Sequence, residues 1–319
     1  IEKRPYLWPC LEDMIALGRE CGARWVTCGR RSKAGHPHHP LYLRADSVTE
    51  PFDPEAYVLA QQARAAAASR GRRKRVCGEA MGKNRLDLSA FDLKLLAMAA
   101  MLADHIGYLF FPQALWMRCV GRLAFPIFAF QVVEGWYRTH DRRRYFLRLA
   151  LCGLLSEIPF DLVIGGQLID PGYQNVLWTF CIAAAALWAM EALRRLQIPL
   201  PLAALCAGAA GYLLGEALQS DYFGPGVLLV LAFALCRGRS GGRIGELAAM
   251  VIVNGRLLPS ASMTVWGMEL PVQLLAAAAL PLIWLYRGRQ GPHGPWLRWV
   301  WYGFYPAHLL VLWLIDTKP

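Results

Sequence analysis

An acid and a base stand side by side, as Asp104 and His105, within the apolar stretch MAAMLADHIGYLFFP. Ionisable side chains in such stretches are costly to bury and usually face a bundle interior or a wet cavity, which makes them functional candidates. Histidine titrates near neutral pH and is the usual general base for a hydroxyl or an amine. We therefore take His105 as the candidate catalytic base. On a regular helix Asp104 points about 100° away from it, so we expect Asp104 to bind an Arg or a Tyr of a neighbouring helix.

Two arginines open the next apolar stretch, and the four-residue spacing of Arg118 and Arg122 places both on one helix face. A guanidinium at this depth needs a carboxylate, because a buried unpaired charge is strongly destabilising. The expected partner of Arg122 is Glu157 or Asp161, which also lie four residues apart. Asp104 is the alternative partner. We expect Arg122 either to stabilise the oxyanion of a tetrahedral intermediate or to form a structural ion pair.

Further polar residues are expected in the same layer, because they interrupt the apolar stretches on one side. Tyr305 and His308 lie three residues apart in the last stretch and are expected to complete the catalytic pocket, although packing between helices is an equally open role for His308. The remaining members are expected to line a substrate pocket: Glu157, Asp161, Asn175, Thr179, Asp221 and Tyr222.

The elements that position these residues are predicted to be membrane-spanning helices. The chain is 56% hydrophobic and only 18% charged, with a mean hydropathy of +0.29, whereas soluble domains carry about a quarter charged residues. The apolar stretches predict an all-α, polytopic bundle of about nine helices of roughly 20 residues each. They are expected near residues 89–111, 115–137, 144–164, 175–194, 198–217, 222–237, 244–258, 269–287 and 297–316.

Basic residues fall in every second loop between these helices, which explains the net charge of +11 without a nucleic-acid partner. Loops that hold an excess of Lys and Arg stay in the cytoplasm, so the alternation predicts a cytoplasmic N-terminus and a multi-pass protein of the cytoplasmic (inner) membrane. The basic loops contain Lys83, Arg85, Arg138, Arg142, Arg143, Arg144, Arg148, Arg194, Arg195, Arg237, Arg239, Arg243, Arg287 and Arg289.

Residues 1–87 differ in composition, because they contain basic runs and no apolar stretch long enough to span a membrane. We expect a poorly ordered basic extension there, with Met81 as a candidate translation start just before the first span. The Cys and His residues between positions 10 and 39 fit no standard zinc spacing, so no metal site is expected. The nine cysteines show no paired spacing, which argues against a disulfide framework.

An ordered set of motifs resembles the TraX family, which is named for the F-pilin acetylation protein. The motifs are FDLKLLAMAAMLADHIGYLFFP, GRLAFPIFAF, YFLRLALCGLLSEIPFD, DYFGPGVLLVL and YPAHLLVL. The resemblance covers a transmembrane domain at 88–317 and excludes residues 1–80. The family itself looks like a distant relative of membrane acyltransferases that O-acylate sugars, with a His in the first helix and an Arg in the next segment. The resemblance implies transfer of acetyl from acetyl-CoA to a peptide N-terminus or a sugar at the outer face.

The expected site of the acyl donor and the expected position of His105 lie at different depths in the membrane. The basic loop Arg142, Arg143 and Arg148 is predicted to be cytoplasmic, where acyl-CoA arrives, and these guanidiniums are candidates for binding its phosphates. A topology signal with headgroup contacts is the favoured alternative for them. Because His105 is expected in the outer half, either the pantetheine arm reaches up a channel, or the acyl group is relayed on His105, or His105 lies a turn deeper than expected.

Two other classes of protein are alternatives to an acyltransferase: a transporter or flippase, and a structural assembly subunit. A proton-coupled transporter or flippase also uses buried Asp, His and Arg. The sequence shows no internal repeat, and its polar residues collect on one side, which favours the acyltransferase. A structural assembly subunit would tolerate substitution of His105 and Arg122.

Overall fold

The structure is a computed structural model that describes residues 7–28, 48–63, 87–265, 268–292 and 294–316. The chain divides into two compact units, residues 1–85 and 86–319. In the first unit, helix α1 (Leu7–Glu20) precedes strand β1 (Val26–Cys28), which pairs antiparallel with β2 (Thr49–Pro51). A further helix covers residues 54–63. The candidate start Met81 and the histidines between positions 36 and 39 lie outside the described residues.

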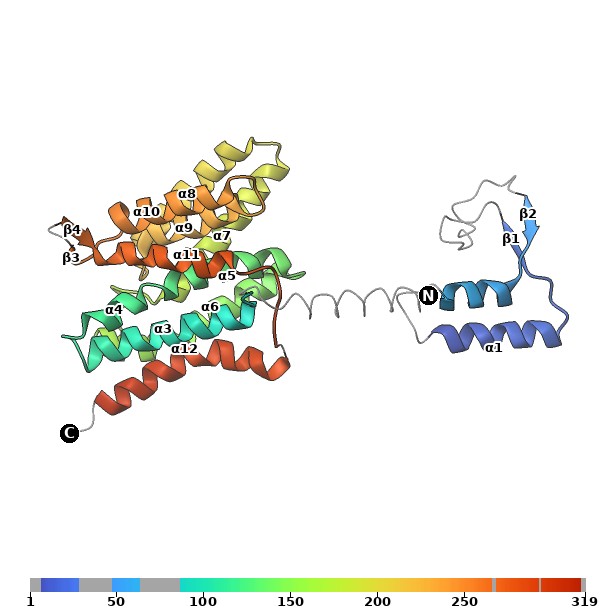
Figure 1. Cartoon of the computed structure of the whole chain (residues 1–319), viewed down its shortest axis with the longest axis horizontal. Coiled ribbons are helices and arrows are strands. Elements are labelled where there is room, and N and C mark those ends of the chain that lie inside the picture. The colour runs from blue at the N-terminus through green and yellow to red at the C-terminus, as the bar shows by residue number, and fades with distance from the viewer. Residues whose placement is uncertain (1–6, 29–47, 64–86, 266–267, 293, 317–319) are drawn as a thin grey trace. The chain divides into compact units, whose positions relative to one another are not determined.

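The second unit consists of helices that run back and forth along the bundle (Figure 1). Two of them are extended by other helical turns: α10 by the π-helical segment η2 (Val253–Leu257), and α11 by the preceding 3-10 segment η3 (Val272–Ala278). The α-helices are α3 (Ala90–Leu109), α4 (Leu115–Gly121), α5 (Ala124–Arg138), α6 (Arg142–Ile164), α7 (Val176–Arg195), α8 (Leu200–Ala217), α9 (Phe223–Cys236), α10 (Gly242–Ile252), α11 (Ala279–Trp284) and α12 (Pro295–Asp316).

The helical segments follow the apolar stretches of the sequence closely, but the second stretch is broken. Helix α4 ends at Gly121 and α5 begins at Ala124. Pro126 explains the break, because it has no amide hydrogen to donate to the carbonyl of Arg122 and its ring crowds that carbonyl. The break places Arg122 at the C-terminal end of α4, before α5 begins.

The eighth stretch also differs from a simple helix. It opens with the hairpin of β3 (Ser262–Val265) and β4 (Met268–Pro271), in which Ser262 pairs with Pro271. The sequence SASMTV alternates small polar and larger side chains, as a strand does, and Pro271 prevents a helix from extending back through it. Helical structure therefore starts only at Val272.

The second unit has the surface of a membrane protein. Among the described residues, three helical segments are long and apolar enough to cross a bilayer: the α4–α5 segment (Leu115–Arg138), α7 and α8. Helix α6 shows a stripe of large apolar side chains at three- and four-residue spacing that are between 49% and 62% exposed. Water disfavours such a stripe, whereas lipid tails accommodate it. Its members are Leu147, Leu151, Leu154, Leu155 and Ile158.

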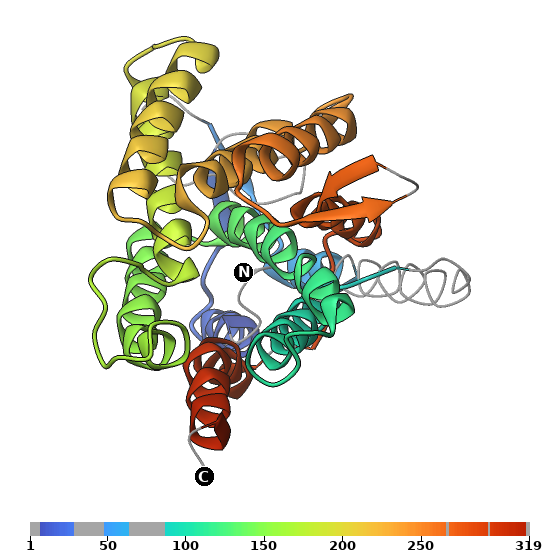
Figure 2. The ribbon, with the colours of Figure 1, turned by 90° about the vertical axis from the view of Figure 1, so that its left-hand side faces the viewer.

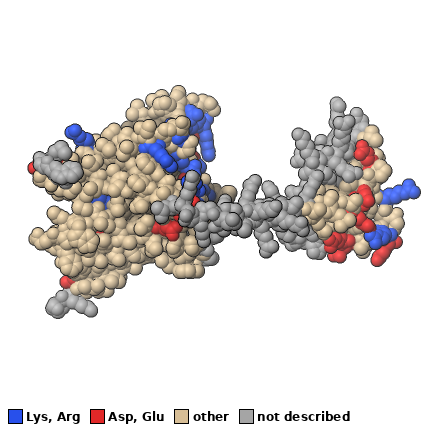
Figure 3. Space-filling view, viewed as in Figure 1, with Lys and Arg blue, Asp and Glu red and all other residues tan. Residues whose placement is uncertain are grey.

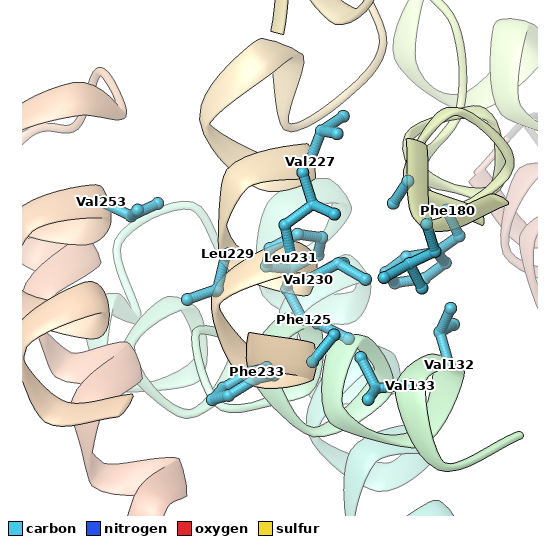
Figure 4. Packing of buried hydrophobic residues seen from close by; sticks show 14 of the residues in the cluster. Phe125, Val132, Val133, Phe180, Val227, Leu229, Val230, Leu231, Phe233 and Val253 are labelled. Atoms are coloured by element: carbon cyan, nitrogen blue, oxygen red, sulfur yellow. The ribbon is translucent and has the colours of Figure 1, made fainter. Parts of the chain in front are cut away.

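The core lies where α5, α7 and α9 meet. Phe125 stacks on Phe180 with ring centroids 5.6 Å apart, and Val227 of α9 is fully buried nearby (Figure 4). Helix α9 is apolar on all sides, as expected for a helix that is surrounded by others. On the other side of the bundle, α12 packs against α6 and α3 (Figure 2). This arrangement brings the two ends of the unit's sequence, α3 and α12, side by side around the candidate site.

Candidate functional site

A cavity of about 290 Å³ lies near the end of α3. Its walls come from α3, α4, the end of α6, the loops before α7 and α9, and η3. Most of its lining side chains are polar or aromatic, although the surrounding helices are apolar. They include Asp104, His105, Tyr108, Arg118, Arg122, Tyr173, Asp221, Tyr222 and Gln273.

Asp104 forms ion pairs with two arginines of α4 and its end. The carboxylate lies 2.9 Å from Arg118 and 3.1 Å from Arg122, and its side chain is only 16% exposed. The expected binding of Asp104 to an Arg of a neighbouring element is therefore confirmed. Gly121 makes the approach possible, because a Cβ at this position would lie 2.2 Å from an Asp104 carboxylate oxygen.

The partner of Arg122 is Asp104, the alternative to Glu157 and Asp161 in the sequence analysis. Arg122 binds Asp104, whereas Glu157 accepts from the amide of Asn175 and Asp161 accepts from the amide of Asp170. The expectation that Glu157 or Asp161 neutralises Arg122 is wrong. The reason is packing: the glycine contact holds the start of the second helical stretch on α3, while the two carboxylates face the α6–α7 connection.

A chain of amide side chains continues from Arg122. Its Nη1 donates to Gln273 Oε1 at 2.8 Å, Gln273 Nε2 donates to Asn254 Oδ1 at 3.2 Å, and Asn254 Nδ2 donates to the carbonyl of Met250 at 3.0 Å. Asn254 and Gln273 are both almost fully buried. Sequence reasoning missed these two residues. The signal was present, because each is a lone amide within an apolar run, VIVNG and PVQLL.

His105 and His308 share a hydrogen bond across α3 and α12. His105 Nδ1 lies 2.8 Å from His308 Nε2, and His308 Nδ1 lies 2.8 Å from the carbonyl oxygen of Phe304. A carbonyl can only accept, so His308 Nδ1 carries a hydrogen. In the neutral imidazole its Nε2 then has the lone pair and accepts from His105 Nδ1. This assignment leaves His105 Nε2 unprotonated, which is the form that a general base requires.

Tyr305 and His308 thus both lie close to His105. The ring centroids of Tyr305 and His308 are 5.6 Å apart, and both side chains are 7% exposed. Tyr305 also lines a small cavity of about 60 Å³ together with Asp104 and His105. The two residues of α12 therefore close the site from the side of the last helix.

Asp221 and Tyr222 enter the site from the connection before α9. The Tyr173 hydroxyl donates to Asp221 Oδ1 at 2.6 Å, and the ring of Tyr222 stacks on Phe125 at 3.5 Å. Burial raises the pKa of the Asp221 carboxyl, against the opposing effect of this hydrogen bond. Thr179 holds the connection in place, because its hydroxyl accepts from the amide of Tyr222 at 3.4 Å. Thr179 therefore supports the pocket without lining the cavity beside His105.

Glu157 and Asp161 in the C-terminal half of α6, and Asn175 at the N-cap of α7, lie outside the cavity lining. Asn175 caps α7 by accepting from the amide of Leu177, and its Nδ2 donates to the carbonyl of Gly153 at 2.9 Å. The three residues were expected to line the substrate pocket. Instead, Glu157 and Asp161 accept hydrogen bonds from the amides of Asn175 and Asp170, and these bonds hold the loop that contains Tyr173.

The arginines proposed for the donor phosphates lie at the start of α6. Arg142 is paired with Glu191 and lies 5.0 Å over the ring of Trp136. Arg143 is exposed, and the buried Nε of Arg148 has no hydrogen-bond partner among the described residues. Of the three, Arg142 is thus already neutralised by a carboxylate, and a phosphate would have to compete with Glu191.

The family-model comparison identifies one family. The model of the TraX protein family matches residues 89–316. The probable fimbrial assembly protein FimC, serogroup H1, of Dichelobacter nodosus is 29% identical over 248 residues, which cover 73% of this chain and 97% of that relative. An uncharacterized protein of Rickettsia prowazekii (strain Madrid E) is 36% identical over 66 residues, 21% of this chain and 25% of its own length. No solved structure matches. The matched span contains every residue of the cavity, and the chain belongs to the TraX family.

Proposed function

We propose that the protein is a multi-pass acyltransferase of the cytoplasmic membrane. It transfers acetyl from acetyl-CoA to an amine or hydroxyl acceptor at the outer face. The observation that carries this proposal is the chain of hydrogen bonds from Phe304 through His308 to His105, which leaves His105 Nε2 as a proton acceptor within a cavity lined by two guanidiniums.

The proposed reaction has two halves. His105 Nε2 takes the proton of the acceptor as its oxygen or nitrogen attacks the thioester carbonyl carbon. The tetrahedral intermediate then collapses, the carbon–sulfur bond breaks, and the departing thiolate takes the proton from His105 Nε2 to give free CoA. His308 accepts from His105 Nδ1 throughout, so it orients the imidazole and stabilises its charged form.

The guanidiniums supply a positive field for the oxyanion. Arg118 and Arg122 share the single carboxylate of Asp104, so this group of three side chains carries a net charge of about +1. Asp221 is the other acid that lines the cavity, and burial raises the pKa of its carboxyl. Preorganised donors beside a developing negative charge are commonly the largest contribution to catalysis of acyl transfer.

The distribution of charge supports the proposed orientation, with a cytoplasmic N-terminus and about nine spans. Arg138 and Arg237 both pair with Glu134, and Arg138 also donates to the carbonyl of Gly288, so the basic connections after α5, α9 and α11 meet at one end. Figure 3 shows most Lys and Arg of this unit near that end on the face drawn. Positive loops stay cytoplasmic, so the proposed orientation has His105 toward the outer side.

The acceptor is proposed from chemistry and from one relative. A general base at neutral pH suits a peptide N-terminus or a sugar hydroxyl. The relative from Dichelobacter nodosus bears the name of a fimbrial assembly protein, which favours a pilin-type peptide N-terminus for the present chain.

The test uses purified full-length protein in lipid nanodiscs with acetyl-CoA that is radiolabelled in the acetyl group. We expect slow release of labelled acetate without an acceptor, and transfer of the label to the peptide when a peptide amine is added. The competing class, a proton-coupled transporter or flippase, predicts no turnover in nanodiscs but His105-dependent movement of a solute or lipid in sealed vesicles. Those two results together would contradict the acyltransferase proposal and support a transporter or flippase.

A further inference from the structure

A second large cavity lies at the opposite end of the bundle from His105. It has a volume of about 450 Å³ and lies where α3 begins and α5 ends. Its polar wall includes Lys94, Gln131, Glu134 and Arg138, and Trp301 of α12 closes one side. Lys94 lies 5.5 Å from the ring centroid of Trp301, and Arg138 is paired with Glu134. The proposed chemistry at His105 uses none of these residues.

A third cavity lies between the two ends and is mainly apolar. It has a volume of about 230 Å³, and Met98, Phe128 and Cys152 are among its walls. It shares Lys94 and Gln131 with the 450 Å³ cavity. At its other end it shares Met101, Phe128 and Tyr305 with the 60 Å³ cavity that contains His105. The cavities therefore lie one after another, and each shares lining residues with the next.

One face of α3 runs along all of them. Lys94, Met98, Met101 and His105 are spaced by four, three and four residues, which places them on the same side of the helix. At the usual rise per residue, about 17 Å separates the levels of Lys94 and His105. A ligand that touches both must be long and narrow.

An unsatisfied polar atom marks the middle of this path. Gln131 lines both the charged and the apolar cavity, and its Nε2 donates to the carbonyl of Ala90 at 3.3 Å. Its Oε1 is buried and has no hydrogen-bond partner among the described residues. A buried acceptor without a partner is costly, so this atom is available to accept from an N–H group of a ligand.

We propose that the cavities form one channel for an acyl donor with a phosphopantetheine arm, which reaches His105 from the Lys94 end. This inference rests on the proposed acyl transfer. The anionic phosphate lies near Lys94, an amide N–H of the arm donates to Gln131 Oε1, and the thioester arrives beside His105. The arm from sulfur to phosphorus has about thirteen bonds, roughly the length of four extended residues, or about 15 Å, which matches the path. The channel replaces Arg142, Arg143 and Arg148 as the donor site.

The test narrows the channel without touching the reacting residues. Met98→Trp fills the apolar cavity, and Leu155→Trp on the exposed stripe of α6 is the matched control. Two thioesters are compared: acetyl-CoA, and the short acetyl thioester of N-acetylcysteamine, which reaches the His105 cavity without the channel. We expect Met98→Trp to lower the acetyl-CoA rate by about tenfold or more, because the larger side chain displaces the arm and misplaces the thioester, while the short thioester is turned over at the wild-type rate.

A second variant tests the amide contact by equilibrium dialysis with CoA. Gln131→Leu should weaken binding by about tenfold, because the donor N–H is left unpaired. The channel is overturned if the Met98 variant turns over acetyl-CoA like the Leu155 control, or if it loses both thioesters equally and the Gln131 variant binds CoA normally. If the wild type turns over neither thioester, the acyltransferase proposal itself fails, and the two failures are thus distinct.

Discussion

His105 and His308 lie 203 residues apart in the chain, yet their ring nitrogens are joined at 2.8 Å. The contact depends on α12 packing beside α3, and on the carbonyl of Phe304, which fixes the hydrogen on the far nitrogen of His308. His308 is thereby a positioning residue, while His105 faces the cavity.

We expect His308→Ala to lower the turnover rate of acetyl-CoA by about 10- to 100-fold, as is typical when a partner that orients a functional imidazole is removed. His308→Gln should recover part of the rate, because its side-chain oxygen can accept from His105 Nδ1. Steady-state kinetics distinguish the roles: kcat should fall while KM stays near its wild-type value. A change confined to KM would show that His308 binds substrate instead.

The two guanidiniums predict an asymmetry in stability. Asp104→Ala leaves Arg118 and Arg122 without their carboxylate and should cost about 3–5 kcal/mol, as is usual for a broken buried ion pair. Arg118→Ala removes the more exposed arginine and leaves the Asp104–Arg122 pair in place, so its cost should be smaller. Thermal unfolding of the two variants in the same detergent measures the difference. Equal losses would contradict the shared-carboxylate arrangement.

Gly121 provides a test of the close approach between α3 and α4. A methyl group at this position would collide with the Asp104 carboxylate, so Gly121→Ala should lower the unfolding temperature and impair turnover together. Gly303 of α12 is the matched control, because a Cβ there meets nothing within 4 Å. Gly303→Ala should leave both quantities unchanged or raise the unfolding temperature slightly, since Ala favours helix. Similar behaviour of the two variants would argue against the contact.

The buried Asp221 predicts a dependence of stability on pH. Its folded-state pKa is raised by burial, so the carboxyl binds its proton more tightly in the folded than in the unfolded protein. The associated stability is present below the ordinary carboxyl pKa of about 3.9 and is lost as pH rises above it. Asp221→Asn should therefore raise the unfolding temperature at neutral pH relative to the wild type, and the gain should shrink toward pH 4. A gain that does not depend on pH would contradict the assignment.

Sequence patterns located the helices because each apolar stretch is bounded by basic or turn-forming residues. They also identified His105, Arg122 and His308, since an ionisable group in an apolar run is conspicuous. The sequence favours Glu157 or Asp161 as the partner of Arg122, and this prediction is wrong. Spacing places Glu157 and Asp161 on one helix face but does not show which helix packs against that face. Asp104 is the partner because Gly121, which has no side chain, allows α4 to pack closely against α3.

Other parts of the site depend on contacts that spacing does not reveal. The hydrogen bond between His105 and His308 requires α12 to return beside α3, which only the packing of the whole bundle determines. The amides Asn254 and Gln273 come from the π-helical and 3-10 segments, where helical periodicity is irregular. Their pairing with Arg122 follows from the shape of those segments.

The central claim is that His105 Nε2 is the base of an acyl transfer. The direct measurement is the initial rate of CoA release from acetyl-CoA by wild-type, His105→Ala and His140→Ala proteins in nanodiscs. His140 is exposed in the α5–α6 connection and makes a matched histidine control. We predict a loss of about 10²- to 10⁴-fold for the His105 variant, the usual contribution of a general base, and an unchanged rate for the His140 variant. Equal rates for all three proteins would contradict the account.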